Sequence, residues 1–256
     1  MSKSVAVVTG ASQGIGRATA IRLARDFSAL VLIARNQVNL AQTAEAVRTV
    51  GAQALVIDAD LAQPQAAQAV VDQTLGAFGR IDALLNIAGA VPQIDLFEMT
   101  DAQWESGLAL KLHGARRLTV AAWPALRESK GSVVLMSGNS ALFPKAPYAA
   151  VGTINAAIVA LAKAFSDRGI TDGVQVNSVL PGPVMTGRRR SYLEHWAPLH
   201  NMTVEEATAS FPKEAGIARY GEPDEIAELM AFLVSPGAHW MTGSTLRMDG
   251  GEVKSV

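Results

Sequence analysis

The segment of this chain that most directly indicates chemistry is a glycine-rich stretch near its beginning. It reads Thr9, Gly10, Ala11, Ser12, Gln13, Gly14, Ile15 and Gly16. Glycines at this spacing permit a tight turn, a close approach of the backbone to a phosphate, and close packing of the following helix on the preceding strand. A helix that begins in such a turn presents free N–H groups and its positive dipole end to an anion. The stretch therefore predicts a dinucleotide site.

That turn needs a strand before it and a helix after it, and the sequence predicts both. Apolar, β-branched runs alternate with segments of helical periodicity along the chain. We expect strands at Val5–Val8, Ala29–Ala34, Ala54–Ile57, Ile81–Ile87, Ser132–Met136, Val174–Leu180 and Thr245–Met248. We expect helices at 15–26, 37–50, 65–76, 101–129, 150–167 and 223–234. This alternation predicts an α/β fold in which a doubly wound parallel sheet carries helices on both faces.

Composition narrows the possible functions. The chain has 256 residues, a net charge of −1 and no cysteine. We therefore expect one domain, 1–256, with no nucleic-acid or membrane partner, because the net charge gives no strong field. The four histidines lack metal-ligand spacing, so we expect no metal. No apolar run is expected to reach the about 18 residues of a membrane helix, and the beginning lacks a signal-peptide core, which predicts a cytoplasmic protein.

The glycine-rich stretch resembles the Thr-Gly-x-x-x-Gly-x-Gly fingerprint of the short-chain dehydrogenase/reductase family. Further marks of that family follow in the same order over nearly the whole chain: Asp60-Leu61, Asn86-Ile87-Ala88-Gly89, Asn177, Pro181-Gly182-Pro183-Val184-Met185-Thr186 and Asp249-Gly250-Gly251. The resemblance implies a single Rossmann-type domain, an oxidoreductase activity with a nicotinamide cofactor, and a homo-oligomer, tetramer or dimer, built on helices 101–129 and 150–167.

The glycine-rich stretch and the resemblance together assign a set of residues to the cofactor. These are Gly10, Ser12, Gln13, Gly14, Ile15, Gly16, Arg35, Asp60, Leu61, Asn86, Ala88, Gly89, Pro181, Gly182, Val184 and Thr186. The second strand ends in Ala34, where a carboxylate would favour NAD, and Arg35 follows it. A guanidinium can pair with a 2′-phosphate, so the sequence favours NADP. The alternative is that Arg35 is solvated and that the site accepts NAD as well.

The catalytic positions depart from the family pattern. The resemblance implies a Ser, a Tyr, a Lys four residues after the Tyr, and an Asn on an earlier helix. Alignment from the strands on either side places Gly138, Val151, Asn155 and Lys111 at these positions. The usual proton-transfer groups are therefore replaced.

Three hypotheses remain open. In the first, the chain is an enzyme with a rearranged site that interconverts a small carbonyl compound and an alcohol. Lys and Asn are exchanged between Lys111 and Asn155; Asn155 then binds water or ribose, and Ser137 or Ser140 anchors the carbonyl. Tyr148 donates the proton and Lys111 is its electrostatic partner. Tyr148 lies on the same face as Val151, provided that the helix already begins there. In the second, the chain is an inactive dinucleotide binder, a sensor or scaffold. In the third, its substrate needs no acid from the protein.

The segment 187–218 interrupts the strand–helix alternation and is expected to lie near the carboxyl ends of the strands, where such sheets bind ligands. It begins with Arg188, Arg189 and Arg190. One of these arginines could pair with an anionic substrate or with cofactor phosphates; the alternative is a solvated run of charge. Trp196, Met202 and Phe211 are expected to line the pocket or to form a subunit contact.

Overall fold

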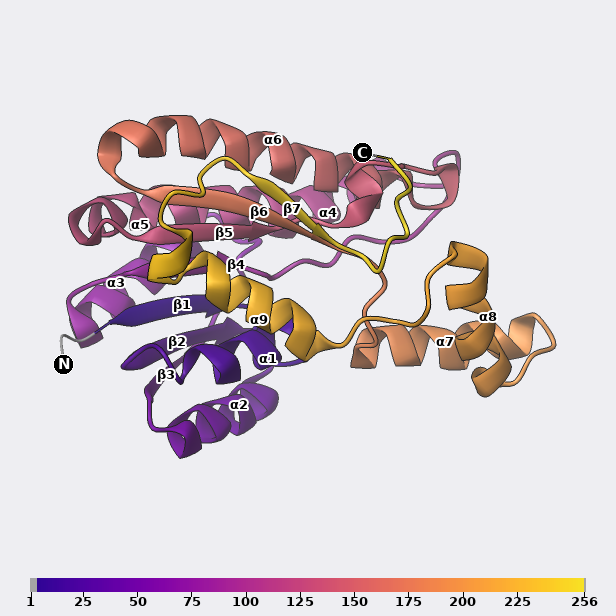
Figure 1. The fold of residues 1–256 in the computed structure, drawn as a ribbon, viewed down its shortest axis with the longest axis horizontal. Helices are drawn as coiled ribbons and strands as arrows, with labels where there is room; N and C mark the ends of the chain where they lie inside the picture. The colour runs from indigo at the N-terminus through magenta and orange to yellow at the C-terminus, as the bar shows by residue number, and fades with distance from the viewer. Residues whose placement is uncertain (1–3, 256) are drawn as a thin grey trace.

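A computed structural model describes residues 4–255. Within them, seven parallel strands form one sheet of order β3-β2-β1-β4-β5-β6-β7 (Figure 1). The strands are β1 Val5–Thr9, β2 Ala29–Ala34, β3 Gln53–Asp58, β4 Ala83–Asn86, β5 Ser132–Met136, β6 Gln175–Pro181 and β7 Thr245–Met248. The predicted parallel, doubly wound sheet is confirmed.

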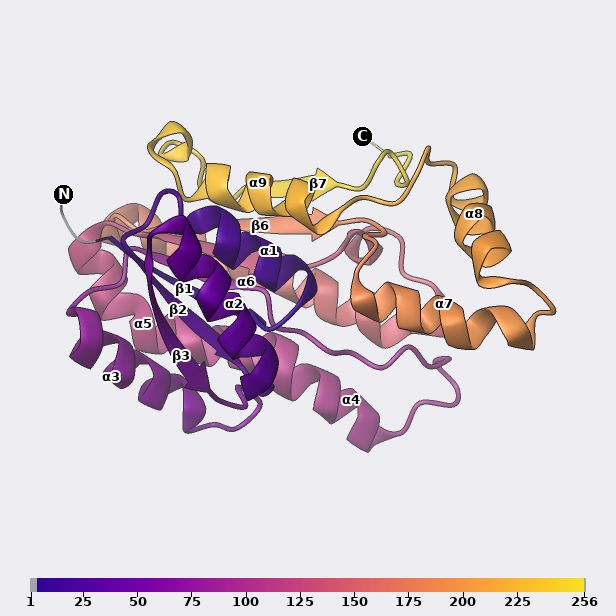
Figure 2. The same ribbon diagram turned by 90° about the horizontal axis from the view of Figure 1, so that it is seen from below.

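Helices cover both faces of this sheet (Figures 1 and 2). The helices are α1 Gly14–Leu23, α2 Gln37–Val50, α3 Ala66–Phe78, α4 Asp101–Gly107, α5 Ala115–Ser129, α6 Ala149–Asp172, α7 Gly187–Leu199, α8 Val204–Ala215 and α9 Pro223–Leu233. A π-helix, η1 Leu108–Gly114, joins α4 to α5, and short 3₁₀ turns are η2 Asn139–Ala141, η3 Ala146–Tyr148 and η4 Pro236–Ala238. Helices α1, α2 and α9 pack on one face, and α3, α5 and α6 on the other.

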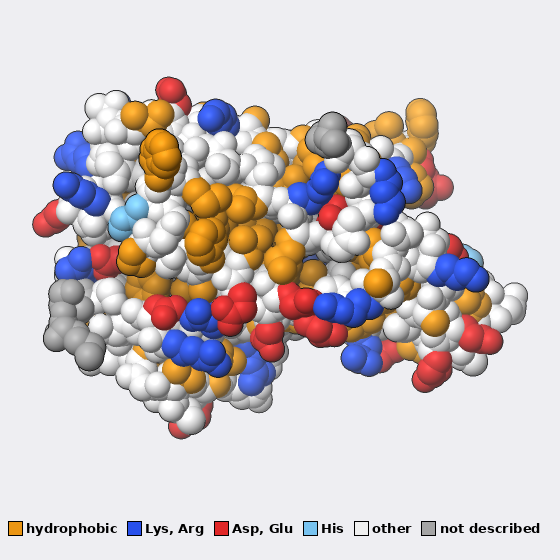
Figure 3. Space-filling view, viewed as in Figure 1, with side chains coloured by type: hydrophobic (Ala, Val, Ile, Leu, Met, Phe, Trp, Pro, Cys, Tyr) orange, Lys and Arg blue, Asp and Glu red, His pale blue; other side chains and the backbone are white. Residues whose placement is uncertain are grey.

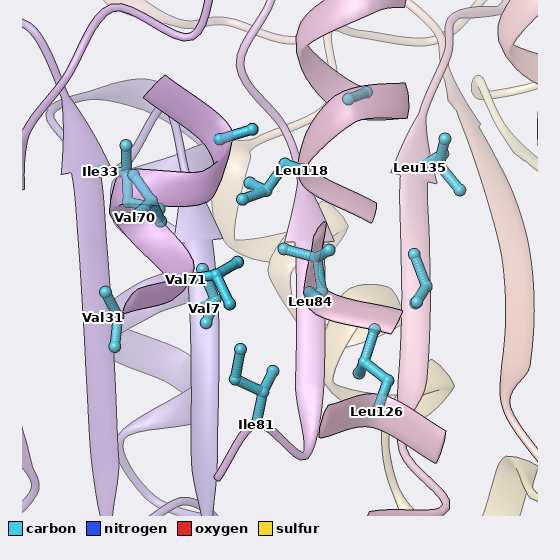
Figure 4. Close-up of a cluster of buried hydrophobic side chains, with 14 of the residues drawn as sticks. Val7, Val31, Ile33, Val70, Val71, Ile81, Leu84, Leu118, Leu126 and Leu135 are labelled. Atoms are coloured by element: carbon cyan, nitrogen blue, oxygen red, sulfur yellow. The ribbon is translucent and has the colours of Figure 1, made fainter. Parts of the chain in front are cut away.

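The two faces hold two separate cores because side chains alternate along a strand. In β1, Val5 and Val7 point into the core under α3, α5 and α6, whereas Ala6 and Val8 point into the core under α1, α2 and α9. Figure 4 shows part of the first core, where Leu84 of β4 lies among side chains from the neighbouring helices and strands. The continuous apolar runs of the strands are therefore explained by burial on both faces.

The direction of winding reverses between β1 and β4, which are neighbours in the sheet although two strands separate them in sequence. A crevice opens at the carboxyl ends of the strands at such a point, and α/β sheets bind ligands there. The glycine-rich turn follows β1 and the Asn86–Gly89 segment follows β4. The fold thus brings two predicted cofactor segments to one place.

Two helical regions differ from the sequence prediction. The predicted helix 101–129 contains the π-helix η1 in its middle. The sequence did not predict this π-helix, because apolar periodicity does not distinguish i→i+4 from i→i+5 hydrogen bonding. Its last residue, Gly114, lies so close to the Leu61 carbonyl that a β-carbon there would be 2.9 Å from the oxygen. The segment 187–218 forms α7 and α8, which extend to one side of the sheet (Figures 1 and 2).

Helix α6 corrects one prediction from composition. Residues 146–172 form one helical stretch that is long and apolar enough to cross a bilayer, although no such run was expected. In the fold, α6 packs along β6 and β5, and Ile154, Ile158 and Ala162 are buried. Packing against the sheet accounts for its apolar character.

Candidate cofactor and carbonyl site

One large pocket of about 870 Å³ lies at the carboxyl ends of β1 to β4. Twelve of the residues predicted to bind the cofactor line it: Gly10, Ser12, Gln13, Gly14, Ile15, Gly16, Arg35, Asp60, Leu61, Ala88, Gly89 and Thr186. Four others, Asn86, Pro181, Gly182 and Val184, are not among the lining residues. The volume falls within the range of ligand and cofactor sites, about 300–1,000 Å³.

The glycine-rich turn has the geometry that a phosphate cradle needs. Gly10 has a φ of +69°, and a β-carbon there would lie 3.1 Å from the Ala88 backbone. The Thr9 hydroxyl accepts hydrogen bonds from the Ile87 and Ala88 amides at 2.8 and 2.9 Å, which fixes the turn against the segment after β4. No side chain caps the N-terminus of α1, so its first amides are available to an anion. These residues fit a dinucleotide.

The ends of β2 and β3 form the side of the pocket that carries Arg35. Arg35 is exposed and takes part in no ion pair among residues 4–255. Asp58 pairs with Ala34 in the sheet and also lines the pocket, and its carboxylate accepts a hydrogen bond from the Gln37 amide at 2.6 Å. Sequence reasoning missed Asp58. The register of β2 against β3, which places it beside Ala34, would have revealed it.

Lys111 and Asn155, the two residues predicted to have exchanged positions, are in direct contact. The Lys111 ammonium donates to the Asn155 Oδ1 at 2.5 Å and to the Ser137 carbonyl at 3.1 Å. The Asn155 Nδ2 in turn donates to the Ser140 Oγ at 2.9 Å. Lys111, Asn155 and Ser140, from η1, α6 and η2, therefore form one chain of hydrogen bonds, which we call the Lys111 chain.

The position of the Asn155 amide depends on the absence of a side chain at position 138. A β-carbon on Gly138 would lie 2.6 Å from the Asn155 Nδ2, so only glycine leaves room for the amide in this position. The Ser137 hydroxyl donates to the Asn155 backbone carbonyl at 2.7 Å, so its proton is already engaged. Ser140 accepts from Asn155, and its own proton stays available for a substrate oxygen. Of the two predicted anchors, the hydrogen bonds favour Ser140.

Lys111 lies in an environment that favours the neutral form of its amine. Its methylenes cover Gly89, where a β-carbon would lie 3.0 Å from the lysine Cδ. Burial, and to a smaller extent the positive charge of Arg188, lower the pKa of Lys111 from 10.5 to about 8. Near neutral pH the amine remains charged, but a modest rise in pH removes its proton.

Tyr148 is not joined to the Lys111 chain by any hydrogen bond in the described residues. Tyr148 is the N-cap of α6, with φ −147° and ψ 41°, and the helix begins at Ala149. The predicted position of Tyr148 on the same face as Val151 required the helix to begin at Tyr148 itself. Burial raises the pKa of the Tyr148 phenol, and the Glu252 carboxylate raises it further. The phenol is therefore a neutral hydrogen-bond donor, and its role as proton donor stays a prediction.

The first residues of α7, Gly187 and Arg188, line the pocket beside Gly89. Arg188 lines the pocket and donates to the Gly89 carbonyl at 3.2 Å. Arg189 lies over three aromatic rings, with its guanidinium carbon 4.9 Å from the Phe211 ring centroid. Trp196, Met202 and Phe211 pack in the small core between α7 and α8 and do not line the large pocket.

Residues 4–255 contain no group of three or more His, Asp or Glu side chains that could hold a metal ion.

Comparison with known proteins identifies the family. Residues 10–252 match the family model described as enoyl-(acyl carrier protein) reductase. The chain is 32% identical over 249 residues to the short-chain reductase protein NovJ of Streptomyces niveus, covering 97% of this chain and 94% of that protein.

Two solved structures share the fold closely. L-sorbose reductase from Gluconobacter frateurii, complexed with NADPH and L-sorbose, has a TM-score of 0.95 at 28% identity, covering 100% of this chain and 98% of its own. A variant of actinorhodin polyketide ketoreductase with NADPH has a TM-score of 0.92 at 29% identity, covering 98% and 97%. The ordered motifs, the sheet and these matches agree: the chain belongs to the short-chain dehydrogenase/reductase family.

Proposed function

We propose that this protein is an NADP-preferring oxidoreductase that interconverts a small carbonyl compound and its alcohol. The pocket fits a dinucleotide, and the two similar structures are complexes with NADPH. Arg35 lies beside the end of β2 and forms no ion pair with any of residues 4–255. When bound, the nicotinamide supplies or accepts the hydride. The chain's own residues then have to hold the carbonyl oxygen and stabilise the negative charge that develops on it.

The contact between Lys111 and Asn155 is the observation that carries this proposal. Moving an ammonium partly out of water costs free energy. Such a group is retained where hydrogen bonds offset this cost or where the protein uses the charge. Here Lys111 keeps its charge and donates to Asn155, which stands at the position that the family resemblance assigns to lysine. A dinucleotide binder without catalysis would need no such cation, so the contact favours the enzyme over the scaffold.

In the proposed reaction, the Ser140 hydroxyl donates a hydrogen bond to the carbonyl oxygen. Asn155 holds Ser140 in place through its Nδ2. The positive charge of Lys111 acts on the Asn155 Oδ1 and polarises the hydrogen bonds of the Lys111 chain. The neutral Tyr148 phenol donates the proton, as the sequence predicts. In reduction, a hydride, which is one hydrogen nucleus with two electrons, passes to the carbonyl carbon and one proton passes to the oxygen, which gives the alcohol.

The same proposal includes a homo-oligomer, either a tetramer or a dimer. Val120 on α5 and Ile170 on α6 are exposed apolar side chains on the helices that were predicted to form the subunit contact. Figure 3 shows a second gathering of hydrophobic side chains in the middle of the face that carries β7 and α9. Burial of either surface against another copy would remove apolar area from water.

The function is tested by measuring the carbonyl-dependent oxidation of NADPH over a panel of small ketones and aldehydes. We expect Lys111→Met and Ser140→Ala each to lower kcat about 100-fold, because each removes stabilisation of the developing oxyanion. NADPH affinity, measured by calorimetry, should change less than about threefold, since neither side chain lines the dinucleotide pocket.

The control is Lys130→Met, which removes an exposed lysine at the end of α5. Equal turnover in all variants would disprove the roles of Lys111 and Ser140. Tight NADPH binding by the wild type, without turnover on any carbonyl or alcohol, would instead support the non-catalytic binder.

A further inference from the structure

Two cations, Arg188 of the pocket lining and Lys111 next to it, lie beside Gly89, and no carboxylate among residues 4–255 pairs with either. Among residues 4–255, seven ion pairs are present and none includes Lys111 or Arg188. The hydrogen-bond partners of Lys111 are a carbonyl and an amide oxygen, and the partner of Arg188 is the Gly89 carbonyl. Both cations are thus held in place by neutral groups.

Both cations contact Gly89. The Lys111 methylenes cover its α-carbon, and Arg188 binds its carbonyl oxygen. Their mutual repulsion is large enough to help lower the pKa of Lys111. Such repulsion is unfavourable in the free protein, and an anion bound between the two groups would remove it.

The acidic side chain that reaches this edge of the site does not serve as that anion. Glu252 accepts a hydrogen bond from Asn139 and acts on the Tyr148 phenol, and its charge does not contribute to the pKa shift of Lys111. The counter-charge therefore has to come from a ligand.

We propose that Arg188 and Lys111 bind an anionic group of the substrate, so that the preferred substrates are oxo acids whose carboxylate lies beside Gly89. This inference rests on the proposed function, because it names the substrate class for the same site. The carboxylate is not altered in the reaction. The keto group becomes a hydroxyl by gain of a hydride from the nicotinamide cofactor and a proton at oxygen, and the oxidised cofactor is released.

A cofactor phosphate is the other possible source of the anion, but the position of Arg188 argues against it. The phosphate cradle is formed by the glycine-rich turn, where Gly14 lies against the Thr186 side chain. Arg188 is anchored instead to the segment after β4, next to Lys111, which contacts β5 and α6 through Ser137 and Asn155. Its guanidinium therefore lies on the side of the Lys111 chain, where the carbonyl is reduced.

The test compares each oxo acid with its uncharged carboxamide, which has nearly the same shape. The probes are 2-oxobutanoate with 2-oxobutanamide, and acetoacetate with acetoacetamide, all with NADPH. For at least one pair, we expect kcat/KM of the acid to exceed that of the amide by about 30-fold or more, because charge-assisted pairing with a guanidinium strengthens binding. In Arg188→Gln this ratio should fall about tenfold or more, mainly through the KM of the acid, and Arg188→Lys should restore part of it.

The matched control is Arg190→Gln, which removes an exposed arginine from the same helix but not from the pocket, and which should keep the wild-type ratio. A ratio near one in the wild type for both pairs would overturn the proposal, although turnover of the amides would leave the proposed function intact. The proposal also fails if Arg188→Gln weakens NADPH binding about tenfold and leaves the ratio unchanged, because the guanidinium would then serve the cofactor phosphates.

Discussion

At the scale of single residues, the site depends on pairs of residues that are compatible only with each other. Gly138 leaves room for the Asn155 amide, and the amide connects Lys111 to Ser140. A serine at position 138 would force Asn155 to move, so the residues at positions 138 and 155 depend on each other.

This coupling predicts the effect of Gly138→Ser. The new β-carbon displaces the Asn155 amide and breaks the Lys111 chain, so we expect kcat for carbonyl reduction to fall about 10- to 100-fold while NADPH binding is retained. The control is Gly76→Ala, since a β-carbon at Gly76 meets no atom within 4 Å. Unchanged turnover in Gly138→Ser would show that the position of the amide does not matter.

Arg35 predicts the cofactor preference. Loss of one charge-assisted pair with the 2′-phosphate costs about 1.5–3 kcal/mol, so Arg35→Ala should shift the NADP-to-NAD ratio of kcat/KM about tenfold or more toward NAD. Arg25→Ala removes an exposed arginine outside the pocket and serves as control. If the ratio stays constant, Arg35 is a solvated side chain and the preference has another origin.

The sequence indicated the residues that act through local geometry. Among those that depend on tertiary contacts, Asp58 was missed, and Arg188 was named as a candidate without its place beside Lys111. Gly10, Gly14 and Gly16 could be predicted because the turn itself demands them. Asp58 reaches the pocket through strand register, and Arg188 is placed beside Lys111 only by the docking of α7. Spacing along one chain does not encode these contacts.

At the scale of elements, the π-helix η1 carries Lys111 and separates α4 from α5. π-helical turns cost stability and often occur at functional sites. The sequence predicted a helix through this region correctly, but periodicity gave no sign of the π-helical segment. Its end is set by Gly114, which packs against the Leu61 backbone.

Gly114→Ala tests the contact at the end of this π-helix. The added methyl would lie 2.9 Å from a backbone oxygen that cannot easily move. We expect a loss of about 1–3 kcal/mol in the free energy of unfolding, which lowers Tm by about 2–10 °C. Calorimetry, with Gly76→Ala as the control, measures this. An unchanged Tm would mean that η1 can shift without cost.

At the scale of the whole molecule, the exposed apolar side chains of α5 and α6 predict self-association. Sedimentation equilibrium should give the wild type a mass of two or four times 26.9 kDa. Val120→Glu should lower the mass, because it places a charge on a surface that would otherwise be buried against another copy. Val38→Glu, on an exposed part of α2, is the control. A wild-type monomer would contradict the proposed oligomer.

Carbonyl reduction at the proposed site depends on a positive charge at Lys111, and the pH dependence of the rate gives the most direct test. The pKa of Lys111 is lowered to about 8 by burial and by Arg188, so the amine is charged below that pH and neutral above it. For a neutral ketone, kcat of reduction should therefore be level between about pH 6 and 7 and should fall toward about tenfold per unit above about pH 8. Lys111→Met should be slow, without this inflection. A wild-type rate that stays level through about pH 9, or an inflection and rate that persist in Lys111→Met, would contradict the account.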